Sequence, residues 1–196
     1  MGGITLDDMK AAGALLEGHF KLSSGLHSSR YLQCALYLAE PERAAAAGRQ
    51  LAARLKGCSP QLVVAPALGG VIVGHEVARA LGVPFFFTER TAEGCMELRR
   101  GFAISPGTRV LVVEDVITTG GSTREVMNVI EAGGGVVVGV GSMVHRSADE
   151  NPFDPLPFKA LLRVEVANHP RESCPLCQAG APLVKPGSRP AAMSTE

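Results

Sequence analysis

Residues 110–122, which read VLVVEDVITTGGS, constrain the fold and the chemistry more than any other part of the chain. Apolar residues suited to a strand that is buried on both faces run directly into Glu114 and Asp115. A loop of small residues then leads into a helix expected over residues 122–132. Ligands of open α/β sheets bind beyond the carboxyl ends of the strands. We therefore expect both acids to emerge where a ligand lies.

The rest of the chain surrounds this stretch with alternating strands and helices. Strands are expected over residues 62–65, 84–88, 109–113 and 136–144, and helices over residues 41–55, 70–81 and 122–132. Residues 158–164 are expected to form an edge strand. The alternation predicts an α/β fold, with a doubly wound, mostly parallel sheet flanked by helices. Residues 89–106 are too long for a simple connection, so they predict a mobile lid or hairpin.

The ends of the chain differ in composition from this core. Thr5 and Asp8 can cap a short helix through about residue 16, and residues 18–30 are polar and rich in turn formers. We expect residues 1–40 to form a small N-terminal hood and residues 41–170 to form the α/β core. Residues 171–196 are expected to form a C-terminal tail that contains a Cys-x-x-Cys pair.

Charge and hydropathy exclude several classes of protein. The 19 Lys and Arg residues balance the 19 Asp and Glu residues, so no global positive field attracts nucleic acid. No apolar run of about 18 residues and no signal peptide are present, which predicts a cytoplasmic protein without membrane contact. The 5 cysteines are an odd number and are interpreted as reduced thiols.

The small-residue loop after the acids suits a phosphate group. Residues 118–122 can present backbone amides and hydroxyls at a helix N-terminus, where unpaired donors and the helix dipole favour an anion. The adjacent carboxylates would repel a phosphate, so they are expected to face sugar hydroxyls. A P-loop is excluded because no Gly-Lys-Ser/Thr follows the glycines. The simpler alternative is that Glu114 and Asp115 only start a turn and cap a helix.

Residues 110–122 resemble the PRPP-binding signature of type I phosphoribosyltransferases, where PRPP is the diphosphorylated sugar that donates ribose 5-phosphate. The resemblance implies that Glu114 and Asp115 hold the ribose hydroxyls and support catalysis. It implies a phosphate-binding set of Val116, Thr118, Thr119, Gly120, Gly121 and Ser122. A second backbone-exposing turn follows the first core strand, and by the same resemblance it binds pyrophosphate through Ala67, Leu68, Gly69 and Gly70.

Residues 20–28, which read FKLSSGLHS, are similar to the base-binding segment of orotate phosphoribosyltransferases. Arg146 corresponds to a position where that family offers a guanidinium to the orotate carboxylate. The resemblance implies orotate contacts from Lys21, Ser23, Ser24, Thr118 and Arg146. The chain departs from the family at Ser23, where many members have a lysine that contacts orotate and pyrophosphate.

The expected lid also departs from the family pattern. Members commonly carry a lysine and a histidine there, whereas this lid has Glu93 and the three arginines Arg90, Arg99 and Arg100. Arginine can neutralise pyrophosphate but rarely transfers protons. We assign the three arginines to the catalytic set. The resemblance further implies a homodimer in which the lid reaches the partner's site.

The resemblance implies transfer of a pentosyl group from PRPP to orotate, a glycosyltransferase reaction of pyrimidine nucleotide biosynthesis. The products would be orotidine 5-phosphate and pyrophosphate. Mg²⁺ is the expected cofactor, and it would bridge substrate oxygens without a dedicated protein cage. Two alternatives stay open, namely a purine phosphoribosyltransferase and a regulator that senses PRPP without turning it over.

Cys174 and Cys177 have the spacing of metal ligands. They could bind zinc together with His169 and one further group, but two cysteines fill only half of a tetrahedral site. Free thiols in a C-terminal tail are favoured, and no residue is assigned as a metal ligand.

Overall fold

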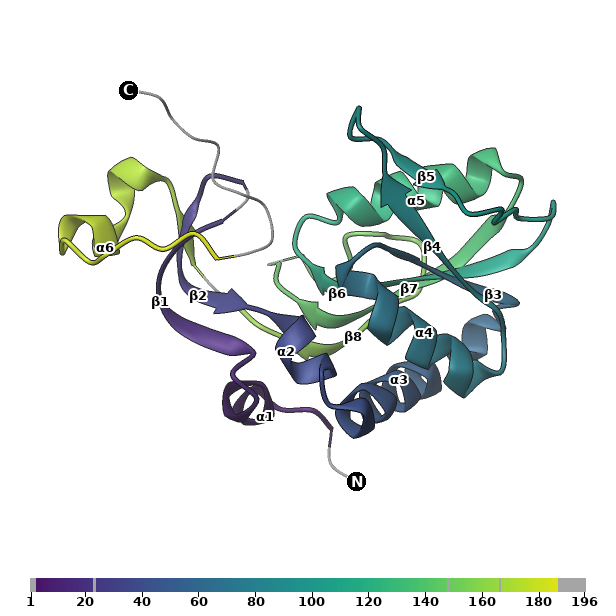
Figure 1. Ribbon diagram of the computed structural model, residues 1–196, viewed down its shortest axis with the longest axis horizontal. Helices are drawn as coiled ribbons and strands as arrows, with labels where there is room; N and C mark the ends of the chain where they lie inside the picture. Colours follow the sequence, from purple (N-terminus) through teal and green to yellow (C-terminus); the bar gives the residue numbers. More distant parts are fainter. Residues whose placement is uncertain (1–2, 23, 148, 166, 187–196) are drawn as a thin grey trace.

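The computed structural model describes residues 3–22, 24–147, 149–165 and 167–186. Most of its strands belong to a six-stranded sheet with the order β5-β4-β3-β6-β7-β8 (Figure 1). The strands are β3 (Leu62–Pro66), β4 (Phe85–Arg90), β5 (Met96–Leu98), β6 (Arg109–Ile117), β7 (Val136–His145) and β8 (Phe158–Arg163). Neighbouring strands are parallel except β4 and β5, which are antiparallel. The predicted α/β fold with a mostly parallel sheet is confirmed.

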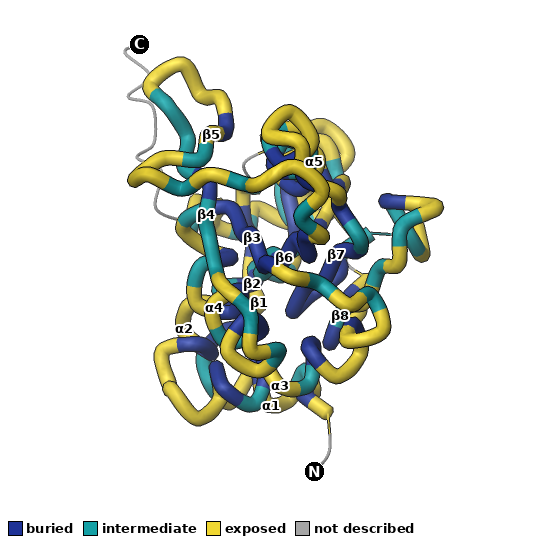
Figure 2. Tube along the Cα trace, turned by 90° about the vertical axis from the view of Figure 1, so that its right-hand side faces the viewer, coloured by how far each residue is buried: buried dark blue, intermediate teal, exposed yellow. Residues whose placement is uncertain are grey.

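Alternate residues of the central strands pack on opposite faces of this sheet. Val63 packs with the helices α3 (Pro41–Leu55) and α4 (Gly69–Leu81). Leu62 and Val64 pack on the other face with the helix α5 (Gly121–Ala132). Figure 2 shows β3, β6 and β7 as buried segments beneath exposed loops. Because both faces are covered, these strands are continuously apolar in the sequence, which is why they could be predicted.

Residues 89–106 contain the end of β4, a turn and β5, so the predicted hairpin is confirmed. The core helices begin and end within one residue of the predicted bounds. β4 and β6 extend beyond their predicted ends, to Arg90 and Ile117. β8 lies at an edge of the sheet, as expected for residues 158–164.

The N-terminal segment differs from the prediction. Thr5 and Asp8 do form a capping box, but the helix α1 (Leu6–Ala11) ends at Ala11 and not near residue 16. Residues 18–30 are not merely turns, because β1 (Leu15–Lys21) and β2 (His27–Leu32) form an antiparallel hairpin. Backbone hydrogen bonds between β1 and β2 satisfy main-chain amides for which the sequence suggested no partner. A short helix α2 (Cys34–Leu38), which was not expected, leads into α3.

The C-terminal segment packs with this hairpin and not with the core sheet. β9 (Asn168–His169) pairs with β2 to complete a three-stranded sheet. The segment continues through the short 3-10 helix η2 (Arg171–Ser173) and the helix α6 (Pro175–Gln178), which lies beside β1 and β2 in Figure 1. Farther along, Val184 exchanges backbone hydrogen bonds of 2.8 Å with His19 and Lys21. The division at residues 40 and 170 stays a prediction.

The packing of α3 against α4 depends on a close approach of the two helix backbones. A Cβ placed on Gly48 of α3 would lie 2.5 Å from the Cβ of Glu76 and 2.6 Å from its carbonyl carbon. Backbone atoms cannot move aside as a flexible side chain can. Gly48 therefore sets how closely the two helices pack beneath the sheet.

Another short 3-10 helix, η1 (Lys56–Cys58), follows α3. None of the described helices combines the length and the apolar character needed to cross a membrane.

We predict that Gly48→Ala destabilises the protein by about 1–3 kcal/mol, because overpacking outweighs the higher helix propensity of alanine. The matched control is Gly57→Ala, since an added Cβ there meets no atom within 4 Å. The control is expected to stay within about 0.5 kcal/mol of the parent in urea unfolding. Equal stabilities of the two variants would contradict the close approach of α3 and α4.

Candidate active site

Glu114 and Asp115 lie near the carboxyl end of β6, in the middle of the core sheet. The strand does not end at Val113, because Val116 and Ile117 still pair with Val144 and His145 of β7. Both acids are partly buried. The prediction that they emerge at the ligand-binding edge of the sheet agrees with this position.

Burial makes both acids difficult to ionise in the free protein. Burial first and the neighbouring Asp115 second raise the pKa of Glu114 from its ordinary 4.5 to about 8. A 3.2 Å hydrogen bond from the Thr123 hydroxyl to Glu114 Oε2 acts in the opposite direction. Burial also raises the pKa of Asp115, although the Val116 amide donates to its Oδ1 at 2.8 Å. Hydroxyl donors or a nearby cation would stabilise the charged forms.

The loop after β6 forms a small pocket with Glu114. Gly120 adopts a left-handed conformation with φ of +78° and begins α5 without a side-chain cap. The first-turn amides of α5 have no intrahelical partners, and their residues Gly121, Ser122 and Thr123 line the pocket. The pocket has a volume of about 70 Å³. Its lining residues are Glu114, Val116, Ile117, Thr118, Gly120, Gly121, Ser122 and Thr123. The predicted phosphate loop and one predicted sugar-binding acid thus share a pocket.

The turn predicted to bind pyrophosphate lies directly against Asp115. A Cβ placed on Gly69 would lie 2.7 Å from Cγ, Oδ1 and Oδ2 of Asp115. The Ala67 amide donates to Thr88 O at 2.8 Å, the peptide between Ala67 and Leu68 is cis, and Leu68 is 83% exposed. Two turns that are far apart in the sequence therefore flank the acidic pair at one edge of the sheet.

Arg146 connects this edge to the hood. Its backbone amide donates to Ile117 O at 2.7 Å. Its Nη2 donates to Ser28 Oγ and to Asn168 Oδ1, both at 2.8 Å. Its Nε is buried without a hydrogen-bond partner among the described residues, and burial lowers the pKa of the guanidinium. A buried donor without a partner favours an acceptor from a ligand.

The structure shows no interaction of the other predicted orotate contacts in the hood with Arg146 among the described residues. Lys21 ends β1 and Ser24 lies in the following turn, and both are exposed. Ser23 lies outside the described residues. Sequence reasoning missed Thr123 and Asn168. Nothing in the sequence links Asn168 to Arg146, whereas Thr123 directly follows the predicted phosphate loop.

Two of the three predicted lid arginines are already paired within the chain. Arg100 donates to both carboxylate oxygens of Glu89 at 2.8 Å and lowers the pKa of that carboxyl. Arg90 Nη1 lies 2.8 Å from Glu125 Oε2 of α5, and its charge partly opposes the rise in the pKa of Glu114. Arg99 is exposed. Arg90 is therefore the lid arginine whose charge acts on Glu114 from within its own chain.

We predict that Glu114→Gln makes the free protein more stable at pH 8 and above. Between pH 4.5 and about 8 the folded wild-type protein keeps a proton that the unfolded chain loses, so its stability falls as the pH rises. Glutamine keeps the shape without this penalty. The melting temperature of Glu114→Gln relative to the wild-type protein should therefore rise from pH 4.5 to about 8, and the two should not differ below pH 4.5. Thermal scans without substrate and magnesium measure it, with exposed Glu131→Gln as the control. A pH-independent difference would contradict the buried-acid account.

Comparisons with known proteins agree with this geometry. A sequence model described as the phosphoribosyl transferase domain matches residues 37–160. The orotate phosphoribosyltransferase of Carboxydothermus hydrogenoformans is 56% identical over 178 residues, which cover 90% of this chain and 92% of the relative. That of Pelotomaculum thermopropionicum is 54% identical over 177 residues, again covering 90% and 92%.

Solved structures show the same family. The crystal structure of orotate phosphoribosyltransferase from Aeropyrum pernix matches with a TM-score of 0.70 and 25% identity, over 82% of this chain and 94% of that one. Adenine phosphoribosyltransferase from Thermoanaerobacter pseudethanolicus shares the fold, with a TM-score of 0.60 and 20% identity over 69% of this chain and 88% of that one. The chain belongs to the orotate phosphoribosyltransferase family, within the type I phosphoribosyltransferases.

Proposed function

We propose that the chain transfers ribose 5-phosphate from PRPP to orotate, which yields orotidine 5-phosphate and pyrophosphate. The bond from the anomeric carbon to a pyrophosphate oxygen breaks, and a bond to a ring nitrogen of orotate forms as that nitrogen loses its proton. The observation that carries the proposal is that two turns flank one acidic pair. Gly69 lies against Asp115, and the amides that start α5 share a pocket with Glu114.

The acidic pair holds and activates the sugar. Glu114 and Asp115 accept hydrogen bonds from the ribose hydroxyls, and their charge stabilises positive charge that develops at the anomeric carbon. Because burial makes these acids hard to ionise in the free site, their charged forms gain most when donors arrive. The binding of PRPP is thereby coupled to ionisation of the pair.

The two turns hold the two anionic ends of PRPP. The loop of residues 118–122 binds the 5-phosphate at the N-terminus of α5, and residues 67–70 receive the departing pyrophosphate. Mg²⁺, when bound, supplies positive charge to the pyrophosphate and ribose oxygens. The acidic oxygens of Glu114 and Asp115 suit this hard cation, which keeps several water ligands and needs no cage of protein groups.

Arg146 is positioned to recognise the carboxylate of orotate. Its guanidinium is held by Ser28 and Asn168, and its Nε still lacks a partner among the described residues. Lys21, Ser23, Ser24 and Thr118 complete the proposed orotate set. A purine has no carboxylate, so this arginine favours orotate over a purine base.

We propose that the protein acts in the cytoplasm.

We predict that pyrophosphate release, followed with Mg²⁺, PRPP and a panel of free bases, occurs with orotate and not with purines. Asp115→Asn and Glu114→Gln should each lower the rate on the order of 100-fold or more, because each loses charge stabilisation in the transition state. Glu131→Gln at the exposed end of α5 is the matched control and should keep the parent rate. Unchanged release in both acidic variants would mean that the sugar site is assigned wrongly.

The lid arginines support a homodimer with a shared site. Arg99 is exposed directly after β5, while Arg90 and Arg100 are held by acids of their own chain. We propose that Arg99 reaches the pyrophosphate in the partner's site. β5 is an edge strand of the core sheet, and Arg99 directly follows it at the end where Leu98 pairs with Thr88 of β4.

We predict that two inactive variants complement each other. Arg99→Ala should lack lid function and Asp115→Asn should lack sugar binding, whereas a hybrid dimer has one intact site. Mixing equal amounts, with unfolding and refolding to exchange subunits, should restore about a quarter of the wild-type rate. Arg99→Ala mixed with itself is the control. No recovery in hybrids that size-exclusion or native mass measurements confirm would place the lid in its own chain's site.

A further inference from the structure

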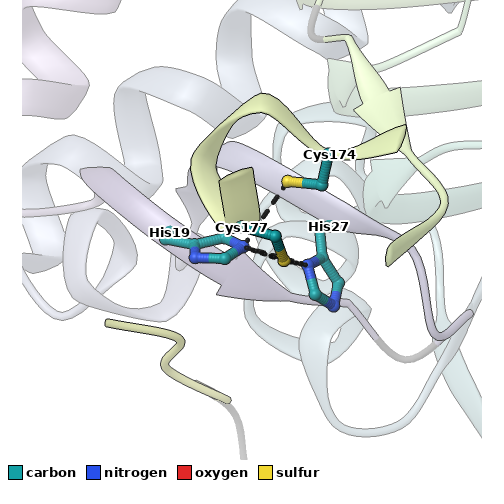
Figure 3. A group of neighbouring side chains, drawn as sticks. All are labelled: His19, His27, Cys174 and Cys177. Atoms are coloured by element: carbon teal, nitrogen blue, oxygen red, sulfur yellow. Dashed lines mark hydrogen bonds between the residues drawn. The ribbon is translucent and has the colours of Figure 1, made fainter. Parts of the chain in front are cut away.

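Two histidines of the hood hairpin and two cysteines of the C-terminal segment form one compact group. His19 lies on β1 and His27 on β2, while Cys174 precedes α6 and Cys177 lies within it (Figure 3). One potential ligand atom from each residue lies within 4.8 Å of the others. His19, His27 and Cys174 are buried, and Cys177 is partly buried. The group is separate from the acidic pair on β6.

The distances within the group suit a tetrahedral ion. Cys174 Sγ and Cys177 Sγ each lie 3.6 Å from His19 Nε2, and Cys177 Sγ lies 3.2 Å from His27 Nδ1. Zinc with Zn–S of about 2.3 Å and Zn–N of about 2.0–2.1 Å separates neighbouring ligand atoms by roughly 3.3–3.8 Å. The two imidazole nitrogens are 2.9 Å apart, so they need to separate by only a few tenths of an ångström.

The surroundings orient His19 as a ligand. Its Nδ1 lies 2.9 Å from the carbonyl oxygen of Ala181, which can only accept, so Nδ1 carries the proton. Nε2 is then left with a free lone pair that faces both thiols. Such a hydrogen bond from the second ring nitrogen to a carbonyl fixes the tautomer of metal-bound histidines. The β1–β2 register also shifts between Glu17 and Phe20, which re-aims the side chains beside His19.

We propose that His19, His27, Cys174 and Cys177 bind one structural Zn²⁺ ion. Two thiolates and two imidazoles are a donor set that zinc prefers, and four protein ligands leave no open position for catalysis. The sequence favoured free thiols, and its zinc alternative used His169, which is absent from this group of ligand atoms. His169 pairs with His27 in the β2–β9 ladder.

A metal explains why the C-terminal segment folds on the hood. α6 spans four residues and β9 two, which is too little for independent stability. The hood sheet has three strands and buries few large apolar side chains, a situation in which small units commonly rely on a metal or a disulfide. The ion would join segments about 150 residues apart in the sequence.

The site also supports the base-binding region. Ser28, which follows His27 on β2, and Asn168 on β9 accept the two side-chain hydrogen bonds of Arg146. The zinc ion would therefore fix the positions of both acceptors without contacting substrate. This role follows from the local geometry and does not depend on which base is used.

The test measures the metal content of protein produced without a histidine tag, in reducing buffer, by inductively coupled plasma mass spectrometry. About one zinc per chain is expected. Cys174→Ser and Cys177→Ser should lose it, while Cys95→Ser, which changes an exposed cysteine outside the group, should retain it. X-ray absorption of the wild-type protein should show two sulfur and two nitrogen neighbours.

A second measurement keeps the proposal testable if a cysteine variant fails to fold. A strong chelator should lower the melting temperature of the wild-type protein, and added zinc should restore it, because the ion binds the folded state. Wild-type protein that is free of zinc after growth in zinc-supplemented medium would overturn the proposal. A Cys174–Cys177 disulfide in freshly purified protein, or a metal content that Cys177→Ser leaves unchanged, would overturn it as well.

Discussion

Two carboxylates on consecutive residues, held at the end of a buried strand, are the constraint around which the site is built. Glu114 and Asp115 are both shielded from solvent by burial, which raises the pKa of both. The fold keeps this costly arrangement through main-chain geometry, since Gly69 allows one turn to touch Asp115 and Gly120 starts α5 beside Glu114. A site whose acids are hard to ionise when it is empty is suited to a substrate that brings hydroxyl donors between two anionic groups.

Arg146 is one polar link between the hood and the core. Its backbone is tied to β6 and its side chain to β2 and β9, so the guanidinium lies where the sugar site and the hood meet. Any shift of the hood changes where this arginine points. The proposed zinc site holds the same two strands together, which links the order of the C-terminal segment to the geometry of base recognition.

The core could be predicted from the sequence because its signals are local. β3 contains the apolar run of residues 62–65, β6 contains the apolar run of residues 110–113, and α3 and α4 have helical patterns. The hood could not, because the β1–β2 hairpin depends on cross-strand pairing that its polar composition conceals. The histidine pair was also missed, since β1, β2 and α6 bring His19 and His27 to the cysteines only after folding. Lid ion pairs such as Arg100 with Glu89 likewise need coordinates.

A crystal structure of the protein with PRPP and Mg²⁺ tests the central claim most directly. The account predicts that carboxylate oxygens of Glu114 and Asp115 contact the ribose hydroxyls. It also predicts that main-chain amides of residues 118–122 hold the 5-phosphate and that residues 67–70 contact the pyrophosphate. A sugar bound away from β6, or a 5-phosphate held by side chains while those amides remain without contact to it, would contradict the account.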